Sequence, residues 1–152
     1  MEVKKLRYNK PPEVKALEKL YHAFKITQHP NVPAQWIPET KFRDDKTNDL
    51  TKCVVAYTKA KGHFIERISS TGRYFNGKWI PTSGTKGTAD LSAVINGRAV
   101  KIEIKCRATK DRQSPDQKKY QQQVEQAGAV YIIIRDFKEY FNWLNDFTNE
   151  QD

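Results

Sequence analysis

The feature that most constrains this chain is an Asn96-Gly97 dipeptide between two runs of alternating polar and apolar residues, 88–95 and 98–105. Asn-Gly is typical of a two-residue turn between antiparallel strands, because both central residues of that turn need positive φ angles. The turn also sets the register, so residues that face each other have numbers that sum to 193. One face of this predicted hairpin is almost wholly apolar and must pack against a core.

The opposite face of the hairpin carries the residues that suggest chemistry. In the predicted register Asp90 directly faces Glu103, and Lys105 lies two residues further along the same face. Opposed Cβ atoms lie about 4.5–5.5 Å apart, and like charges at that distance are destabilising. A divalent cation would remove the conflict, because hard cations bind carboxylate oxygens and keep waters for a substrate. The alternative is an ordinary solvated sheet face on which lysines offset the acids.

Two carboxylates, a cation and a lysine are a combination that suits cleavage of a phosphodiester bond. The cation polarises the phosphate and lowers the pKa of water, and the lysine stabilises the charge that develops in the transition state. A short pattern of this kind occurs often by chance, so its surroundings must support it.

Periodic segments flank the hairpin on both sides. Apolar residues at helical spacing, with prolines near the first turns and glycines after the last, indicate helices. The run AVYIIIR is continuously apolar, and we expect it to form a strand buried on both faces. The predicted elements are helices at about 13–26, 47–61, 114–127 and 137–147 and strands at 63–68 and 129–135, with Thr47 and Ser114 as helix N-caps. This order predicts a mixed α/β sandwich.

Residues 1–46 are expected to form a basic N-terminal arm, and residues 47–152 the main domain. Five of the seven prolines lie in this arm, at a spacing that a long sheet cannot accommodate. We expect one amphipathic helix there, followed by an extended linker at about 29–39. The arm could clamp DNA, form a homodimer or bind another protein, and the sequence leaves these alternatives open.

The formal net charge of +9 favours a polyanionic partner, since binding releases counterions from the polyanion. We expect DNA, with a merely basic surface as the alternative. Residues 69–88 combine cations and aromatic rings around an Asn76-Gly77 turn, which predicts a flexible basic flap. Its rings could stack on unpaired bases, or two of them could fold into the core. The predicted DNA contacts are Arg73, Tyr74, Lys78, Trp79 and Lys86 in the flap and Arg107, Lys110 and Arg112 after the main hairpin.

Several classes of protein are disfavoured. No stretch approaches the roughly 18 consecutive apolar residues of a membrane span, so we expect no membrane partner. The first residues lack the apolar segment of a secretory signal, and we expect a cytoplasmic protein. Cys53 and Cys106 are too few for a disulfide framework and lack zinc-ligand spacing, so we expect two reduced thiols.

Four short motifs carry a resemblance to a known family. They are Gly87-Thr-Ala-Asp-Leu91, Ile102-Glu-Ile-Lys105, Ser114-Pro-Asp-Gln117 and Gly128-Ala129 before an apolar strand. In this order and spacing the chain resembles the PD-(D/E)xK nuclease superfamily, and within it the VRR-NUC (virus-type replication-repair nuclease) group. The resemblance covers about residues 47–147.

The resemblance implies a restriction-endonuclease-like mixed sheet flanked by helices that hydrolyses DNA with Mg²⁺ or Mn²⁺. Asp90, Glu103 and the backbone carbonyl of Ile104 would hold the metal, and Lys105 would position or activate water. Gln117 matches a glutamine of the group's active site, but Ser114-Pro-Asp-Gln117 also fits a helix capping box, and either role or both could apply. Similarity to phage-type nucleases implies a bacterial or phage-infected host cell.

Two departures from the family pattern stand out. Ala89 replaces the proline of the superfamily's name. The acid that many relatives carry early in the first core helix has no glutamate counterpart here, and Asp49 is a weak candidate for it. We therefore predict a metal-dependent DNA nuclease, selective for structures such as flaps, forks or junctions because no separate recognition domain is evident. The main alternatives are a non-catalytic nucleic-acid-binding module that keeps the fold and a protein whose basic arm binds an acidic partner.

Overall fold

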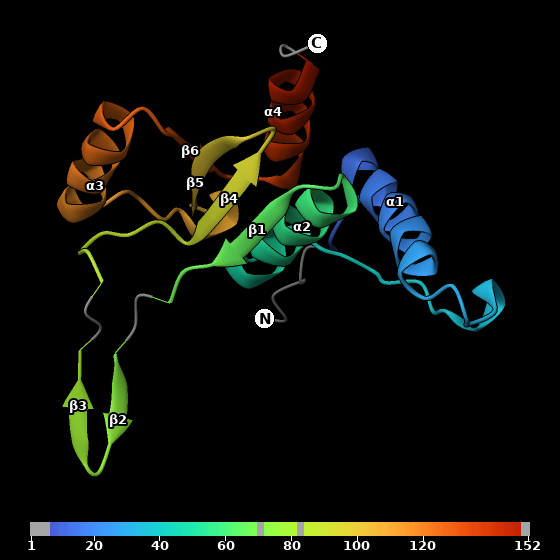
Figure 1. The fold of residues 1–152 in the computed structure, drawn as a ribbon, viewed down its shortest axis with the longest axis horizontal. Helices are drawn as coiled ribbons and strands as arrows, with labels where there is room; N and C mark the ends of the chain where they lie inside the picture. The colour runs from blue at the N-terminus through green and yellow to red at the C-terminus, as the bar shows by residue number, and fades with distance from the viewer. Residues whose placement is uncertain (1–6, 70–71, 82–83, 150–152) are drawn as a thin grey trace, which may run out of the picture.

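The computed structural model describes residues 7–69, 72–81 and 84–149 of the 152-residue chain. Its centre is a four-stranded sheet in the order β1-β4-β5-β6 (Figure 1). The last two strands are parallel and the other neighbours antiparallel, so the sheet is mixed. The predicted α/β class is therefore confirmed. The strands are β1 (Phe64–Arg67), β4 (Leu91–Ile95), β5 (Arg98–Ile104) and β6 (Val130–Ile134).

Helices cover both faces of the sheet. The apolar face packs against α2 (Thr47–Ala60) and α4 (Phe137–Asn149), and α1 (Pro12–Gln28) packs against these two helices and shares one buried core with them and the sheet. The other face meets α3 (Pro115–Gln126) beside β6. All four predicted helices are present. Lys46 rather than Thr47 is the N-cap of α2, however, and no side chain caps that helix. Among the described residues, no helix is long and apolar enough to cross a membrane.

The register predicted from the Asn-Gly turn is confirmed along the whole β4–β5 ladder. Asn96 and Gly97 have φ angles of 48° and 76°, and the paired residues run from Ile95–Arg98 to Leu91–Ile102. The first strand was predicted to begin at residue 88, and this is wrong. The ladder ends at Leu91, and the next N–H of β5 that faces β4, that of Ile104, donates to the side-chain carboxylate of Asp90 instead of a backbone carbonyl.

The core lies between the apolar face of the sheet and the three helices. The side chains of Leu91, Ile95 and Ile102 are fully buried there. Tyr57 of α2 ties this layer to α4, because its ring stacks on Phe141 at 5.1 Å and its hydroxyl donates a hydrogen bond of 2.8 Å to an α4 side chain. The burial of so much apolar surface fixes the orientation of the sheet's opposite, polar face.

The helix of the predicted N-terminal arm is part of this core. Val14 and Leu17 of α1 are fully buried, and α1 packs against α2 and α4. Asp44 ties the end of the segment to the body: it accepts a 2.8 Å hydrogen bond from the Tyr8 hydroxyl and a 3.2 Å bond from the Phe137 N–H at the start of α4. Between α1 and Asp44, the chain extends away from the sheet through a short 3-10 helix, η1 (Ala34–Trp36) (Figure 1).

The strand predicted from AVYIIIR is confirmed as β6, and both of its faces are partly buried rather than fully buried as expected. β6 lies at an edge of the sheet, parallel to β5. Tyr131 and Ile134 are buried, whereas Val130, Ile132 and Ile133 keep partial exposure. A run of apolar residues reports hydrophobicity, and it cannot show that one long edge of the strand lacks a neighbour.

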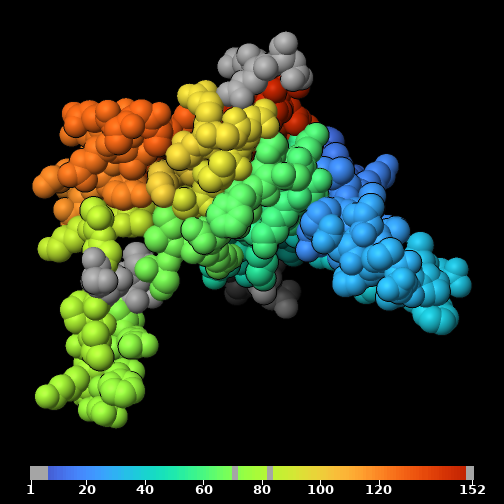
Figure 2. All heavy atoms as spheres, in the orientation of Figure 1, coloured from blue at the N-terminus to red at the C-terminus, as the bar shows by residue number. Residues whose placement is uncertain are grey.

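The predicted flap contains a second β-hairpin, formed by β2 (Arg73–Phe75) and β3 (Lys78–Ile80) around the predicted Asn-Gly turn. It projects from the body of the protein as a separate arm (Figure 2). Tyr74 and Trp79 are 76% and 55% exposed, so the alternative in which two rings fold into the core is wrong for this pair. The connecting residues 70–71 and 82–83 lie outside the described part of the chain.

The packing of α1 makes a prediction about stability. Leu17→Ala is expected to lower the free energy of unfolding by about 2–4 kcal/mol, because it leaves a cavity in the shared core. Val32, which is 41% exposed, provides the control, and Val32→Ala should change stability by less than about 0.5 kcal/mol. Urea denaturation of both variants measures the difference. Equal, small effects would mean that α1 is not part of the cooperative core.

Candidate active site

The four residues predicted to be catalytic meet where the polar face of the sheet approaches α3. Glu103 is the penultimate residue of β5, and Lys105 directly follows that strand. Asp90 directly precedes β4, and Gln117 lies in the first turn of α3. The hairpin register brings the first three together, and the parallel β5–β6 connection brings α3 over them.

Glu103 is the most deeply buried ionisable residue of this group, with 2% of its surface exposed. Its Oε1 accepts a 2.7 Å hydrogen bond from Gln117 and lies 3.4 Å from the Lys105 ammonium. Its Oε2 is buried and has no hydrogen-bond partner among the described residues. Burial raises the pKa of Glu103 to about 7, the nearby charge of Asp90 adds to the rise, and Lys105 opposes it. An unpaired buried carboxylate oxygen costs free energy, which a cationic ligand would recover.

Gln117 is both a helix cap and a partner of Glu103. Its side-chain Oε1 accepts the Ser114 N–H at 2.8 Å, and Ser114 Oγ accepts the Gln117 N–H at 3.2 Å. The predicted capping box is therefore confirmed. Because the cap uses the amide oxygen, the amide nitrogen must turn outward, and it donates to Glu103. Contact of Gln117 with a substrate stays a prediction.

Asp90 lies at the surface and ends the β4–β5 ladder. Its Oδ2 accepts the Ile104 N–H at 2.8 Å, and its backbone carbonyl accepts the Ile68 N–H at 2.9 Å. The N–H and C=O of one residue in an extended strand point to the same side, so the Ile104 carbonyl also faces the Asp90 side of β5. Asp90 and Glu103 are therefore not the ladder pair that the register predicted. They remain close enough for the charge of one to raise the pKa of the other.

Lys105 is 7% exposed and lies between two acids. Its ammonium is 3.4 Å from Glu103 Oε1 and 3.3 Å from Asp111 Oδ2. Asp111 was not among the predicted site residues. The sequence offers one signal for it, because Asp111 is the only acid in residues 106–113, which contain three cations. Only the fold shows that this loop returns to Lys105. Acids on two sides of this buried lysine hold its ammonium in one position.

Gly87 allows the chain to cross closely over the start of α3 before it reaches Asp90. Its φ angle is +74°, and a Cβ atom there would lie 2.3 Å from the backbone of Asp116. Any other residue would strain the backbone and displace the helix. The crossing segment and α3 enclose an open cleft of about 460 Å³. Its lining includes Lys86, Thr88, Ser114 and Gln117.

A divalent cation fits the donors present here. Asp90 and Glu103 supply carboxylate oxygens, one of them the buried, unpartnered Oε2, and the Ile104 carbonyl faces the same side. No three His, Cys, Asp or Glu side chains form a metal-binding cluster in the described ranges, so the protein would offer two carboxylates and one carbonyl. Mg²⁺ suits such a partial set, because it keeps several waters and takes further oxygens from a substrate phosphate.

The other predicted residues are distributed around this centre rather than gathered in it. Arg73 and Lys78 are on the projecting hairpin, and Lys86 lines the cleft. Asp49, the weak candidate, lies in the first turn of α2 on the opposite, apolar side of the sheet, and its ion pair is with Lys52 at 3.9 Å. The cations that follow β5 are exposed in and around η2 (Arg107–Thr109), and they are Arg107, Lys110 and Arg112. Arg107 forms an ion pair with Asp136.

Comparison of the chain with models of protein families, with curated proteins and with solved structures found no match. The support for a function therefore comes from the geometry of the site and from the motif residues. Three features agree there: a buried carboxylate with an unused oxygen, a buried lysine beside it, and a capping amide that holds the carboxylate.

The raised pKa of Glu103 predicts how stability depends on pH. Without metal, the contribution of this group is fully present below its ordinary pKa of 4.5 and is lost as the pH rises through about 7, because the folded state holds the proton more tightly. Glu103→Gln removes this dependence. At pH 8 without metal, we expect the variant to be more stable than the wild type by about 1–2 kcal/mol. Chemical denaturation at pH 5 and pH 8 measures the difference in unfolding free energy between wild type and Glu103→Gln. The same difference at both pH values would contradict the prediction.

Proposed function

We propose that this protein is a metal-dependent nuclease that hydrolyses phosphodiester bonds in DNA. The observation that carries the proposal is the Glu103 carboxylate: it is buried, one oxygen is held by Gln117 and Lys105, and the other has no partner among the described residues. Burying a charge in this way is costly unless a ligand uses it. The resemblance of the motif residues to the VRR-NUC group supports the same function, with a restriction-endonuclease-like fold.

The residues of the site have separate tasks in this proposal. Asp90, Glu103 and the Ile104 carbonyl would hold Mg²⁺ or Mn²⁺, which supplies Lewis acidity toward the phosphate and lowers the pKa of water. Gln117 keeps the Glu103 carboxylate in one orientation, because its own amide is fixed by the helix cap. The free Oε2 of Glu103 then points its negative charge where a cation is needed.

Lys105 stabilises negative charge that develops on the phosphate and positions the attacking water. Its side chain is 8% exposed and its ammonium is held between two carboxylates, so it does not need to be ordered when the substrate binds. Groups that are ordered in advance lower the activation barrier most, because no reorganisation is needed during the reaction. Asp111 keeps the ammonium near Glu103 while leaving its third donor direction for a substrate oxygen.

Binding of the rest of the DNA falls to the cations around the site. The chain has a net charge of +9, and Lys86 lines the cleft next to Gln117. The projecting hairpin and the loop after β5 add Arg73, Lys78, Lys110 and Arg112 on exposed surface. Selectivity for flapped, forked or branched DNA fits a small chain that reads shape and phosphates rather than base sequence. We expect it to act in the cytoplasm of a bacterial or phage-infected cell.

The test is cleavage of a panel of linear, nicked, flapped, forked and four-way-junction DNAs with Mg²⁺ or Mn²⁺. Lys105→Ala should lower the cleavage rate at least about 100-fold, because it removes preorganised charge from the transition state. Lys101→Ala is the matched control, since Lys101 is a lysine of β5, four residues before Lys105, that donates to Ser92 at 2.8 Å and not to a site carboxylate. The control should stay within about threefold of wild type.

Two results would contradict the proposal. One is a wild type with saturating metal that cleaves no DNA of the panel. The other is Lys105→Ala cleaving as fast as wild type. If both proteins are inert and both bind DNA in a salt-sensitive way that EDTA does not change, the non-catalytic nucleic-acid-binding module takes the place of the nuclease.

A further inference from the structure

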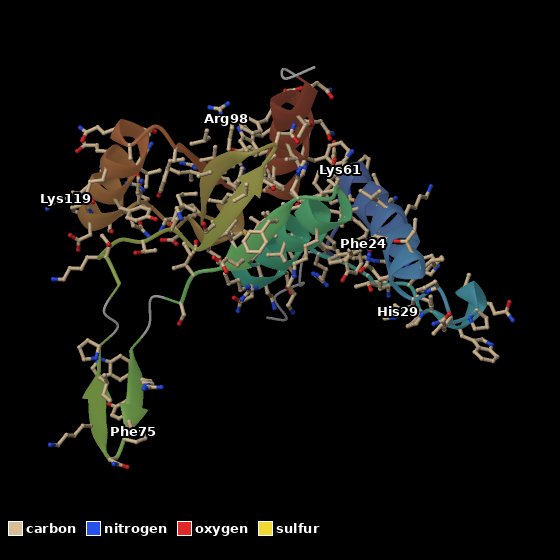
Figure 3. The ribbon with its side chains drawn as sticks, in the orientation of Figure 1. Phe24, His29, Lys61, Phe75, Arg98 and Lys119 are labelled. Carbon is tan, nitrogen blue, oxygen red and sulfur yellow. The ribbon has the colours of Figure 1, made fainter. Side chains whose placement is uncertain are left out.

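The β2–β3 hairpin exposes large apolar side chains of a kind that folded proteins usually bury. Tyr74, Phe75 and Trp79 are all more than half exposed, and Ile80 is 40% exposed. The hairpin extends away from the sheet, with Phe75 near its tip (Figure 3). A two-stranded hairpin gains little stability by itself, so exposed rings on such an element indicate a binding surface.

The two faces of the hairpin differ in composition. Tyr74 and Trp79 are a cross-strand pair, with ring centroids 5.1 Å apart in an edge-to-face arrangement, and they occupy one face. Side chains alternate between faces along a strand, so the other face carries Arg73 beside Ile80 and Phe75 beside Lys78. One face is thus an aromatic platform, defined here as Tyr74 and Trp79, and the other is mixed cationic and apolar.

The aromatic platform is a built feature rather than two loose rings. Gly72 lies beneath the Trp79 indole: a Cβ atom at Gly72 would be 2.7 Å from the ring and 2.4 Å from the Ile80 carbonyl. Only glycine therefore lets the indole lie against the backbone there. With one side of Trp79 against Gly72 and its edge near Tyr74, the hairpin holds the ring in place, and 55% of the residue still faces solvent.

The charge around the platform identifies the kind of partner. Residues 69–89 contain three cations, Arg73, Lys78 and Lys86, and no acid. Alternation of aromatic rings with cations is the surface that binds single-stranded nucleic acid, because bases stack on rings while cations neutralise the phosphates. A paired duplex keeps its bases stacked inside and offers the platform no base face.

The path of the chain connects this platform with the active site. After β3 the chain returns through Lys86 and Gly87, which line the cleft over the start of α3, and reaches Asp90 three residues later. In Figure 1 the hairpin extends from the side of the sheet where α3 lies. A DNA strand that leaves the proposed active site along the cleft would therefore continue toward the β2–β3 hairpin.

We propose that Tyr74 and Trp79 form a stacking site for unpaired DNA bases, so that the substrate is a duplex carrying a single-stranded arm. The assignment of this arm to a cleaved substrate rests on the nuclease function proposed above. Binding of single-stranded DNA to the platform does not depend on it. Fully paired, blunt duplex is then the poorer ligand.

The experiment measures binding in EDTA, so that no cleavage occurs. A fluorescein-labelled 15-mer oligothymidylate and a labelled blunt duplex are titrated with the full chain, and fluorescence anisotropy reports the Kd. Tyr74→Ser with Trp79→Ser should raise the Kd for oligothymidylate at least about tenfold, since each lost stacking contact weakens binding. The Kd for blunt duplex should change by less than about twofold.

Two further variants separate stacking from misfolding and from general apolar loss. Tyr74→Phe with Trp79→Phe keeps the rings and should bind oligothymidylate within about threefold of wild type. Trp36→Ser removes a ring that is 71% exposed but lies on η1, and it should bind as wild type does. Unchanged binding by the double serine variant, or an equal loss in Trp36→Ser, would overturn the stacking site.

Other partners give different results. If the double serine variant binds oligothymidylate normally but loses sedimentation with vesicles of phosphatidylserine and phosphatidylcholine that wild type shows, the hairpin is a membrane contact and the proposal is wrong. The nuclease proposal fails separately. If the wild type cleaves no DNA but the double serine variant binds oligothymidylate more weakly, the stacking site stands and the nuclease function fails. If the wild type cleaves DNA but the double serine variant binds oligothymidylate normally, only the stacking site fails.

Discussion

The hydrogen bond from Gln117 to Glu103 is the interaction on which the organisation of the site depends. It joins the N-terminus of α3 to the polar face of the sheet, across a carboxylate that is almost fully buried. Because the helix cap uses the side-chain oxygen of Gln117, the side-chain nitrogen points toward the sheet. A local capping interaction of α3 therefore sets the orientation of Glu103 on β5. The other oxygen of Glu103 is left without a partner among the described residues, and in the proposed function it is the oxygen that would bind the metal ion.

The surrounding features support this one contact. The close passage of Gly87 over α3 brings Asp90 to the same place, and the burial of Lys105 supplies a positive charge that offsets part of the cost of burying Glu103. The core that the apolar face of the sheet shares with three helices supports β5 from beneath and so fixes its polar face. The same crossing segment continues into the projecting hairpin, so the element that places a predicted metal ligand also carries the aromatic platform.

Local rules explain what could be predicted from the sequence. The Asn96-Gly97 turn predicted every pair of the β4–β5 ladder, because register depends only on the turn and on alternation along the strands. The capping box was likewise readable from Ser114 and Gln117. What failed depended on distant parts of the chain. Asp90 substitutes its side chain for a backbone partner, and β6 lies at an edge, and neither feature leaves a local pattern.

The most direct test of the central claim is binding of Mn²⁺ followed by its electron paramagnetic resonance signal. The account predicts that wild type binds the ion at a site whose affinity falls at least about tenfold in both Glu103→Gln and Asp90→Asn. Glu66→Gln is the control, because Glu66 is an exposed acid on the neighbouring strand β1, and it should bind as wild type does. Equal Mn²⁺ affinity in wild type and Glu103→Gln would contradict the account.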